Sequence, residues 1–388
     1  MEFCFTEEEG EFKREVQDFL RQEVTEEVVE ETVETGGAYG AALARKLVQK
    51  LGSRGWLLPH WPKEYGGLGS SVTMDFIILD EMAYSGLPWS FVGAYMAGPI
   101  ILRQGSEEMK KEFLPRIAKG EIEFALGYTE PDAGSDLASL NVSAEDKGDF
   151  FLVNGQKTFS SHCHLAEYHW LAVRTDFDTK KHRGISMMIV DLRSEGITIN
   201  PMITMAGYRT NEVFYDNVRV PRKNLVGEKN RGFYYLMEAL DFERMFPIGF
   251  YRKLFEGIVE YAKETVIHGK PLSKNSLVRQ KLAQIATELE VVKILYYQLP
   301  YMLEKRMLPN YQSSMQKIFA SELAQRITNT GMEILGPYAQ LKKGAKWAPM
   351  AGKAEYAYRR SVVETIYAGT SEIQRNIIAQ RGLGLPRS

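Results

Sequence analysis

A chain of 388 residues that is 44% hydrophobic can build two or three globular domains with large cores, so it does not depend on disulfides for stability. The formal net charge of −2 excludes the strong positive field expected of a protein that binds nucleic acid or an acidic membrane surface. The two cysteines, Cys4 and Cys163, stand far apart, which excludes a disulfide framework and favours a reducing compartment.

Helical periodicity dominates the N-terminal region. Thr6 and Glu9 have the spacing of a capping box and predict a helix start, after which apolar residues recur at helical spacing. Further amphipathic helices are predicted over residues 75–85 and 109–119, and the acidic run 26–34 is typical of a solvated helix face. The acidic N-terminus is unlike a signal or transit peptide, and no apolar stretch is long enough to cross a bilayer. We therefore expect a cytoplasmic protein, or a mitochondrial matrix protein if the chain is a processed eukaryotic one.

Residues 121–228 change to the pattern of short strands. The run 150–159 contains Asn154-Gly155 between two apolar or alternating segments, and this pair predicts a β-hairpin with a type I′ turn. Further short strands are predicted at residues 168–174, 184–191, 197–200 and 210–215. Short strands at this spacing predict a small barrel or sandwich.

Helical spacing returns after Gly232 in segments long enough for a bundle. The predicted helices cover residues 232–268, 276–306, 311–331 and 370–381, whereas 337–360 is predicted to be irregular. No strand–GxGxxG–helix unit is present, so a dinucleotide would not be bound in the Rossmann manner. The order helix, sheet, helix predicts three domains, over residues 1–120, 121–230 and 231–388.

Two short segments have the residue types of a binding site. The glycines and small residues of 127–136 let backbone N–H groups approach an anion or a flat heteroaromatic ring, and Thr129 and Ser135 add hydroxyls. Taken alone, this segment is more typical of a polar connector. The tripeptide 162–164 reads His-Cys-His, but no further ligand cluster is evident, so we predict no metal site.

Five motifs, in order along the chain, resemble those of the acyl-CoA dehydrogenase family. They are Trp-Pro-x-Glu-Tyr-Gly-Gly at 61–67, Thr-Glu-Pro followed by Gly-Ser-Asp at 129–136, Asn-Gly-x-Lys-x-Phe-x-Ser at 154–161, Val-Arg-Val-Pro-x-x-Asn-Leu-Val-Gly at 218–227, and Gly-Thr-Ser-Glu-Ile-Gln-Arg-Asn-Ile-Ile-Ala at 369–379. The resemblance spans nearly the whole chain. It implies an α+β multidomain fold with an N-terminal helical domain, a middle antiparallel β-barrel that binds flavin, and a C-terminal four-helix bundle.

The resemblance also implies FAD as the cofactor. Phe159 stands where the family has an aromatic packed on the isoalloxazine, and Ser161 stands at the hydroxyl position next to flavin N5. Without the resemblance, a strand aromatic such as Phe159 would be read as a core residue. The other cofactor contacts that the resemblance implies are Leu126, Tyr128, Thr129, Ser135, Thr370 and Glu372.

The family's reaction needs a carboxylate that takes a proton from Cα of the acyl group while a hydride leaves Cβ. Many relatives carry this base in a Tyr-Glu-Gly-Thr segment, but this chain has Ala368 at the glutamate position, and alanine cannot take a proton. A minority that resembles long-chain and isovaleryl-CoA dehydrogenases uses a Glu-Arg pair on an earlier helix, which this chain matches with Glu243-Arg244. Pro247 should loosen the helix there, because proline leaves the carbonyl of Glu243 without its helical partner. A surface Glu-Arg pair is the alternative reading.

Several further positions are implied to meet the substrate or the cofactor. The backbone N–H at position 368 would hold the thioester oxygen, and the implied substrate contacts are Ser135, Asp241, Arg244, Ala368 and Gly369. The chain departs from the family at residues 265–269 and 333–337, where segments that bind the FAD pyrophosphate of a neighbouring subunit have changed. Arg279 is a candidate for the missing positive charge. These changes resemble a bacterial subgroup that acts on bulky, ring-containing or sterol-derived CoA esters, some members of which are heterotetramers.

The sequence therefore predicts an FAD-dependent dehydrogenase that converts an acyl-CoA to the 2-enoyl-CoA and passes electrons to an electron-transfer flavoprotein. The expected assembly is a homotetramer, with a heterotetramer as the alternative. Two other functions stay open: a related flavoenzyme, either an acyl-CoA oxidase or an enoyl-CoA reductase, and a non-catalytic subunit of a heteromeric dehydrogenase.

Overall fold

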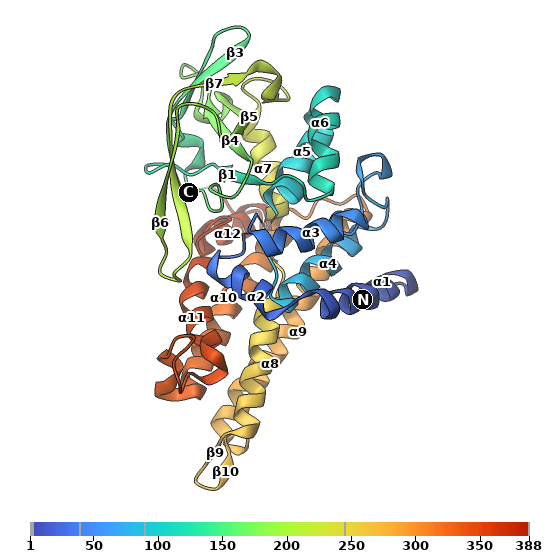
Figure 1. The fold of residues 1–388 in the computed structure, drawn as a ribbon, viewed down its shortest axis with the longest axis vertical. Helices are drawn as coiled ribbons and strands as arrows, with labels where there is room; N and C mark the ends of the chain where they lie inside the picture. The colour runs from blue at the N-terminus through green and yellow to red at the C-terminus, as the bar shows by residue number, and fades with distance from the viewer. Residues whose placement is uncertain (1–3, 39, 89–90, 244–245, 387–388) are drawn as a thin grey trace. The chain divides into compact units, whose positions relative to one another are not determined.

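The computed structural model describes residues 4–38, 40–88, 91–243 and 246–386, and of residues 241–243 it describes the backbone alone. The chain divides into two compact units (Figure 1). We call residues 21–78 and 87–243 the sheet unit, and residues 1–20, 79–86 and 244–388 the bundle unit.

In two helices of the sheet unit, side chains accept hydrogen bonds from N–H groups of the first turn. The carboxylate of Glu31 accepts hydrogen bonds from the N–H of Leu43 at 2.9 Å and of Ala44 at 2.8 Å, and so caps α3. Ser106 caps α6 by accepting from the N–H of Met109. The predicted helices over 75–85 and 109–119 are confirmed as α4 and α6. The α-helices that lie wholly or partly in this unit are α2 (Glu26–Glu34), α3 (Ala42–Ser53), α4 (Val72–Ser85), α5 (Gly98–Gln104), α6 (Glu107–Ala118) and α7 (Gly232–Glu243).

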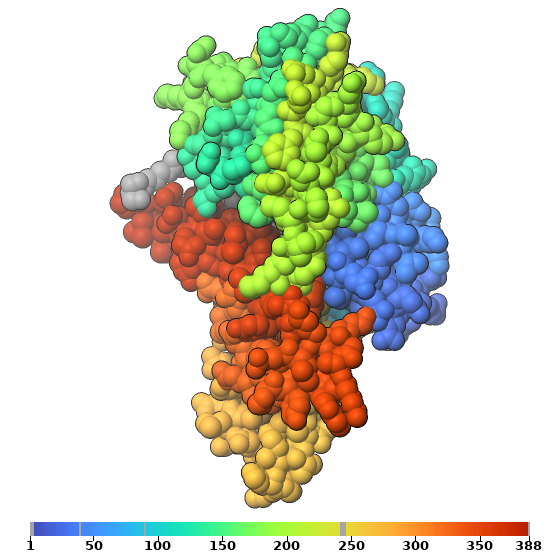
Figure 2. All heavy atoms as spheres, turned by 60° about the vertical axis from the view of Figure 1, so that its left-hand side comes forward, coloured from blue at the N-terminus to red at the C-terminus, as the bar shows by residue number. Residues whose placement is uncertain are grey.

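Eight strands form one sheet in the order β6-β7-β3-β2-β4-β5-β8, with β1 beside β4. They are β1 (Phe124–Gly127), β2 (Ser143–Asp146), β3 (Phe150–Lys157), β4 (Tyr168–Arg174), β5 (Ile185–Asp191), β6 (Ile197–Ile203), β7 (Arg209–Pro221) and β8 (Leu225–Val226). Both β1 and β2 run parallel to β4, so the sheet is mixed where we predicted it to be antiparallel throughout. Among the described strands β6 and β8 are the two ends of the order and do not pair, so a closed barrel remains a prediction. Figure 2 shows β6 and the adjoining part of β7 (lime green) at the surface.

The predicted hairpin at Asn154-Gly155 is wrong. Both residues lie inside the continuous strand β3, which pairs with β2 on one side and β7 on the other. A register shift between Val153 and Gly155 marks a β-bulge, and Gly155 has a φ of 134°. The side chain of Asn154 accepts from the N–H of Asn217 at 2.8 Å. The glycine therefore allows the bulge and not a turn, because the strand's partners come from elsewhere in the chain.

In the bundle unit, helix α10 is central and packs against α8, α9, α11 and α12. The helices are α8 (Gly249–Glu264), α9 (Ser276–Glu304), α10 (Asn310–Leu335), α11 (Lys353–Glu364) and α12 (Ser371–Ile377), together with most of α1 (Glu7–Glu23). The capping box of α1 is confirmed, because Thr6 N–H donates to Glu9 at 2.9 Å and Glu9 N–H donates to Thr6 at 3.2 Å. A two-stranded hairpin, β9 (Val266–Ile267) and β10 (Lys270–Pro271), joins α8 to α9.

Two sequence predictions about the chain after residue 231 need correction. The predicted helix over 232–268 is two helices, because α7 ends at Glu243 and α8 begins at Gly249 beyond Pro247. The segment predicted to be irregular ends earlier than expected, since α11 begins at Lys353. The irregular part after α10, which carries the exposed Trp347, is orange-red in Figure 2.

Candidate active site

A buried ion pair joins two of the motifs in the sheet unit. The ammonium of Lys157 on β3 is fully buried and donates to a carboxylate oxygen of Glu130 at 2.8 Å and to the carbonyl of Tyr128 at 3.0 Å. Glu130 also accepts from the N–H of Asn141 at 2.6 Å and of Val142 at 2.8 Å. Desolvation lowers the pKa of Lys157 to about 8 although Glu130 opposes the shift. This pair, which sequence reasoning did not assign, fixes the loop that follows β1. The sequence did point to both residues, since Glu130 and Lys157 each occupy a specified position of a family motif.

Phe159 projects from the end of β3 as an exposed aromatic. Its side chain is 64% exposed, and its φ of 55° is uncommon for a residue with a large side chain. Asn211 on β7 holds Ser160, the residue after Phe159. The backbone carbonyl of Asn211 accepts from the Ser160 N–H at 3.0 Å, and its side-chain amide donates to the Ser160 carbonyl at 2.9 Å. Ser161 Oγ lies 3.0 Å from Thr210 Oγ1. A flat apolar ring held outward beside two hydroxyls fits contact with a planar heteroaromatic group such as flavin.

The remaining predicted cofactor residues of the sheet unit lie in β1 or in the loop that follows it. Leu126 and Thr129 are half-buried and Ser135 is exposed. Tyr128 is buried, and its hydroxyl accepts a hydrogen bond from Trp170 Nε1 at 2.9 Å, so its side chain belongs to the core and only its backbone can face a ligand.

Gly127 precedes this loop at the end of β1. A Cβ atom there would lie 2.7 Å from the end of the Leu171 side chain, so glycine leaves room for the side chains of β4 beside β1. Behind it, the buried His169 shares a hydrogen bond with the Tyr215 hydroxyl, and burial lowers the pKa of His169 to about 4.

The His-Cys-His tripeptide lies in a turn after β3. Cys163 is buried, and His164 Nδ1 lies 3.2 Å from the side-chain amide of Asn211. Within the described part of the chain, no three or more His, Cys, Asp or Glu side chains are grouped to hold a metal ion.

The second part of the predicted site lies in the bundle unit, in the turn between α11 and α12. Ala368 and Gly369 have φ values of 54° and 87°. Gln374 Nε2 donates to both of their carbonyls, at 2.8 Å and 3.1 Å, and Lys317 Nζ donates to the carbonyl of Gly369 at 3.0 Å. Because trans peptide groups are planar, the N–H groups of Gly369 and Thr370 point away from these buried donors. These bonds hold the backbone of the turn in place, while the donor predicted from the sequence, the N–H of Ala368, belongs to the preceding peptide group and stays a prediction.

Other predicted residues of this unit are more exposed. Thr370 caps α12, since its hydroxyl accepts from the N–H of Ile373 at 3.3 Å, and Glu372 lies exposed in the first turn of that helix. Arg279 is exposed in the first turn of α9.

The predicted base lies at the edge of what is described. Glu243 is the last residue of α7, but the side chains of Glu243 and Asp241 lie outside the described residues, as does Arg244 altogether. No helix in the described part of the chain is both long and apolar enough to span a membrane.

Comparison with known proteins agrees with the three-part organisation. Family models described as acyl-CoA dehydrogenase N-terminal, middle and C-terminal domains match residues 6–121, 125–218 and 230–383. The acyl-CoA dehydrogenase FadE26 of Mycobacterium tuberculosis is 37% identical over the full length of both chains. Two solved structures cover all of this chain and are covered by it completely. The Tcur3481-Tcur3483 steroid ACAD has a TM-score of 0.92 at 34% identity, and the ChsE4-ChsE5 complex from Mycobacterium tuberculosis has a TM-score of 0.91 at 36% identity.

Proposed function

The chain belongs to the acyl-CoA dehydrogenase family, and we propose how its residues divide that family's reaction among them. The enzyme is an FAD-dependent oxidoreductase that removes hydrogens from Cα and Cβ of an acyl-CoA thioester and passes the electrons to an electron-transfer flavoprotein. Bound FAD supplies the acceptor for the hydride from Cβ. The chain itself must bind the ester, polarise its carbonyl and take the Cα proton.

Glu243 is the proposed base, and the observation that carries this assignment is Ala368. The turn at residues 368–370 has no side chain that takes a proton at neutral pH. The nearest buried carboxylate before it, Glu364, is 1% exposed and already bound, because it accepts from the Tyr251 hydroxyl at 2.9 Å, pairs with Arg360 at 3.4 Å and accepts from Tyr367. A carboxylate bound in this way is not free to reach Cα. The Glu-Arg pair that the sequence has at residues 243–244 is then the best remaining source of the base.

The proposed carbonyl site is the backbone of the turn that contains Ala368 and Gly369. The carbonyls of Ala368 and Gly369 are held by Lys317 and Gln374, which supports a fixed backbone in this turn, and the N–H of Ala368 is the proposed donor to the thioester oxygen. Asp241, Arg244 and Ser135 are the further proposed substrate contacts.

The proposed flavin contacts combine side chains and backbone. The exposed ring of Phe159 supports its place against the isoalloxazine, and Ser161 is proposed beside flavin N5. Leu126, Thr129, Ser135, Thr370 and Glu372 are the other proposed side-chain contacts, while Tyr128 would contribute its backbone. Arg279 remains the proposed replacement for the missing pyrophosphate-binding arginine.

We propose a bulky, ring-containing or sterol-derived CoA ester as substrate, and a tetrameric assembly. The similarity to a protein named a steroid ACAD supports the substrate class. Similarity to a ChsE4-ChsE5 complex supports the heterotetramer alternative beside a homotetramer. Three domains over residues 1–120, 121–230 and 231–388, and a cytoplasmic location, complete the proposal, the latter supported by the bacterial origin of FadE26.

The test is anaerobic reduction of the bound flavin by sterol-derived and straight-chain acyl-CoAs. Glu243→Gln should lower the rate about a hundredfold to ten-thousandfold while FAD stays bound. The control is Glu238→Gln, because Glu238 lies on the same helix, is partly exposed and pairs with Arg103. An unchanged rate in the Glu243 variant would refute the base assignment. Oxygen consumption without an added acceptor would indicate an oxidase, and flavin that is not reduced by any acyl-CoA but is oxidised by an enoyl-CoA would indicate a reductase. A colourless chain that gains FAD only with a partner would indicate a non-catalytic subunit.

A further inference from the structure

The turn between α11 and α12 contains a residue in an unfavourable backbone conformation. Ala368 has a φ of 54°, in the left-handed region that residues with a Cβ atom avoid. Alanine otherwise favours a φ of about −60°. A return to that value would rotate the peptide group between Tyr367 and Ala368 by roughly 115° relative to the next one. The N–H of Ala368 belongs to the first of these two groups, so its direction depends on what keeps φ positive.

Tyr367, which precedes the N–H of Ala368, is held by α11. Its own N–H donates to the carbonyl of Val363 at 3.2 Å, and its hydroxyl donates to the carboxylate of Glu364. The same carboxylate accepts from the Tyr251 hydroxyl on α8 at 2.9 Å. Tyr367 is therefore fixed at its backbone and at its hydroxyl. The direction of the N–H of Ala368 then depends on how the carbonyl side of that residue is held.

Gln374, in the first turn of α12, holds that carbonyl side. Its side chain is fully buried, and its Nε2 donates to the carbonyl of Ala368 at 2.8 Å and to the carbonyl of Gly369 at 3.1 Å. The helix fixes Gln374 in turn, since its N–H donates to the carbonyl of Thr370 at 2.9 Å. Lys317 on α10 adds a bond to the carbonyl of Gly369 at 3.0 Å. The bond from Gln374 to the carbonyl of Ala368 is the one that fixes the peptide group beside the proposed donor.

We propose that Gln374 is a positioning residue for the carbonyl site, because its bond to the Ala368 carbonyl keeps φ of that residue positive and so sets the direction of its N–H. This inference rests on the proposed role of that N–H as the donor to the thioester oxygen. A donor stabilises developing negative charge only when it lies at hydrogen-bond distance and points at the oxygen, so a rotation of this size removes the interaction. The Cα proton is then less acidic, and its removal is slower.

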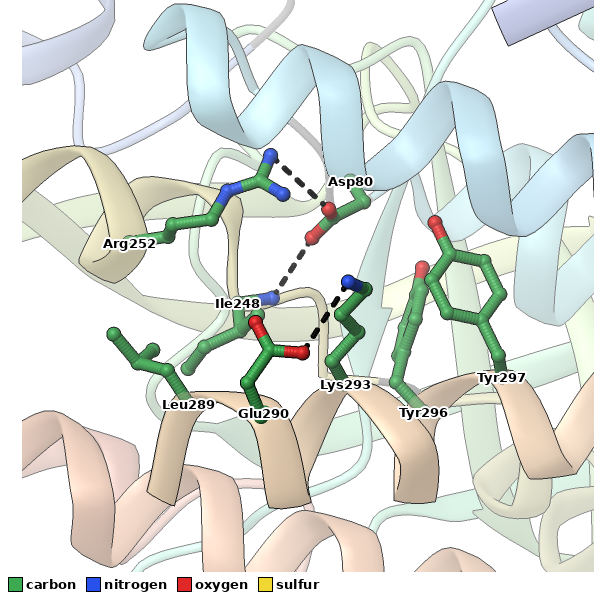
Figure 3. Close-up of a pocket in the computed structure, with 8 residues that line it drawn as sticks. All are labelled: Asp80, Ile248, Arg252, Leu289, Glu290, Lys293, Tyr296 and Tyr297. Carbon is green, nitrogen blue, oxygen red and sulfur yellow. Dashed lines mark hydrogen bonds and ion pairs between the residues drawn. The ribbon is translucent and has the colours of Figure 1, made fainter. Parts of the chain in front are cut away.

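A second buried corner of the same unit is held in a similar way and provides the control. Gln316 on α10 is fully buried, accepts from the N–H of Phe246 at 3.2 Å and donates to its carbonyl at 2.7 Å. Asp80 binds the next part of this corner, where it accepts from the N–H of Ile248 at 3.2 Å (Figure 3). The adjoining cavity of about 50 Å³ has room for a water molecule but not for an acyl-CoA. Gln316→Met therefore removes two bonds from an equally buried amide, as Gln374→Met does, at a corner that has no proposed contact with the thioester.

The test uses cinnamoyl-CoA that carries an isotope label at its thioester carbonyl. This ring-containing thioester binds without reacting, because its Cα–Cβ bond is already double. The infrared band of the labelled carbonyl moves to lower frequency when a donor polarises it, so the shift on binding to the holoenzyme measures the carbonyl site. Gln374→Met should lose about half of the wild-type shift or more. It should also slow flavin reduction about tenfold or more at unchanged FAD content, with the acyl-CoA that reduces the wild-type flavin fastest.

Two further variants separate positioning from a general loss of structure. Gln316→Met should keep the wild-type shift. Gln374→Asn keeps an amide whose shorter side chain cannot reach both carbonyls, so it should lose part of the shift, and it decides the question if Gln374→Met does not fold.

Ala368→Gly tests the cause of the effect. Glycine adopts a positive φ without the steric penalty of a Cβ atom, so Ala368→Gly combined with Gln374→Met should recover part of the lost shift. A merely structural role for Gln374 predicts no recovery. The inference is overturned by a shift in Gln374→Met that stays within about a tenth of the wild-type value, by an equal loss in Gln316→Met, or by no recovery in the double variant. A wild-type holoenzyme that gives cinnamoyl-CoA no shift, or whose flavin no acyl-CoA reduces, would instead show that the proposed function has failed.

Discussion

Replacing Lys157 by methionine removes the counter-ion of Glu130 from the interior of the sheet unit. The remaining carboxylate keeps its two backbone donors, at 2.6 Å and 2.8 Å, and the attraction of the Arg174 guanidinium, but it is 7% exposed and has lost its ion-pair partner. Breaking a buried pair in this way costs about 3–5 kcal/mol, and the retained N–H bonds argue for the lower end, about 3 kcal/mol. That corresponds to a fall in apparent Tm of about 6 °C or more. The loop after β1 should loosen as well, so FAD should be lost more readily.

The assay is thermal unfolding together with the FAD content of the purified protein. Lys181→Met is the control, because Lys181 pairs with Asp136 at 3.0 Å in the same region but both side chains are largely exposed, and such pairs contribute about 1 kcal/mol or less. Removing both charges, in Glu130→Gln with Lys157→Met, should recover part of the loss, because desolvation outweighs attraction within the pair, as the lowered pKa of Lys157 indicates. A Lys157→Met protein that keeps its FAD and unfolds within about 1 °C of the wild type would refute this reasoning.

Two further predictions concern His169 and Gly369. His169 has a folded pKa of about 4 against 6.5 for the free side chain, so the unfolded chain binds a proton that the folded chain does not as pH falls from 6.5 towards 4. Up to about 3 kcal/mol of stability should be lost over that window, and His169→Gln should flatten the acid side of a Tm-against-pH curve; an equally steep curve would contradict it. Gly369→Ala should cost about 1–2 kcal/mol and weaken flavin bleaching by acyl-CoA, because its φ is 87° and the new Cβ would lie 2.7 Å from Gln374 Nε2. Gly344→Ala has a similar φ of 86° but open space around it, so equal effects of the two variants on bleaching would exclude the contact with Gln374 as the cause.

Local signals in the sequence predicted local structure well. The capping box at Thr6 and Glu9 depends on four consecutive residues, and the structure has both of its hydrogen bonds. Pro247 correctly marked a disturbance after Glu243, but helical periodicity on both sides concealed that it separates two helices. The start of the helix at Lys353 was missed because the segment predicted to be irregular, over residues 337–360, included the first residues of that helix.

Contacts between distant residues could not be read from spacing. Asn154-Gly155 has the composition of a hairpin turn, yet β2 and β7 compete for the same strand and make it continuous. In the sequence, Glu130 and Lys157 are charged residues of two separate motifs, and only the fold shows that they form an ion pair with each other. Only the fold likewise shows that the Gln316 side chain binds the backbone of Phe246, which lies 70 positions earlier in the chain.

The conformation of Ala368 explains how the base and the carbonyl site can be separated. An alanine at a φ of 54° is less favourable than glycine, by about 1 kcal/mol, so the surrounding structure must impose it. Gln374 and Lys317 impose it from outside the turn, and neither contact uses the side chain at position 368. A glutamate can therefore be absent there without loss of the backbone donors. Activity then requires a carboxylate from elsewhere in the chain, which is the role proposed for Glu243.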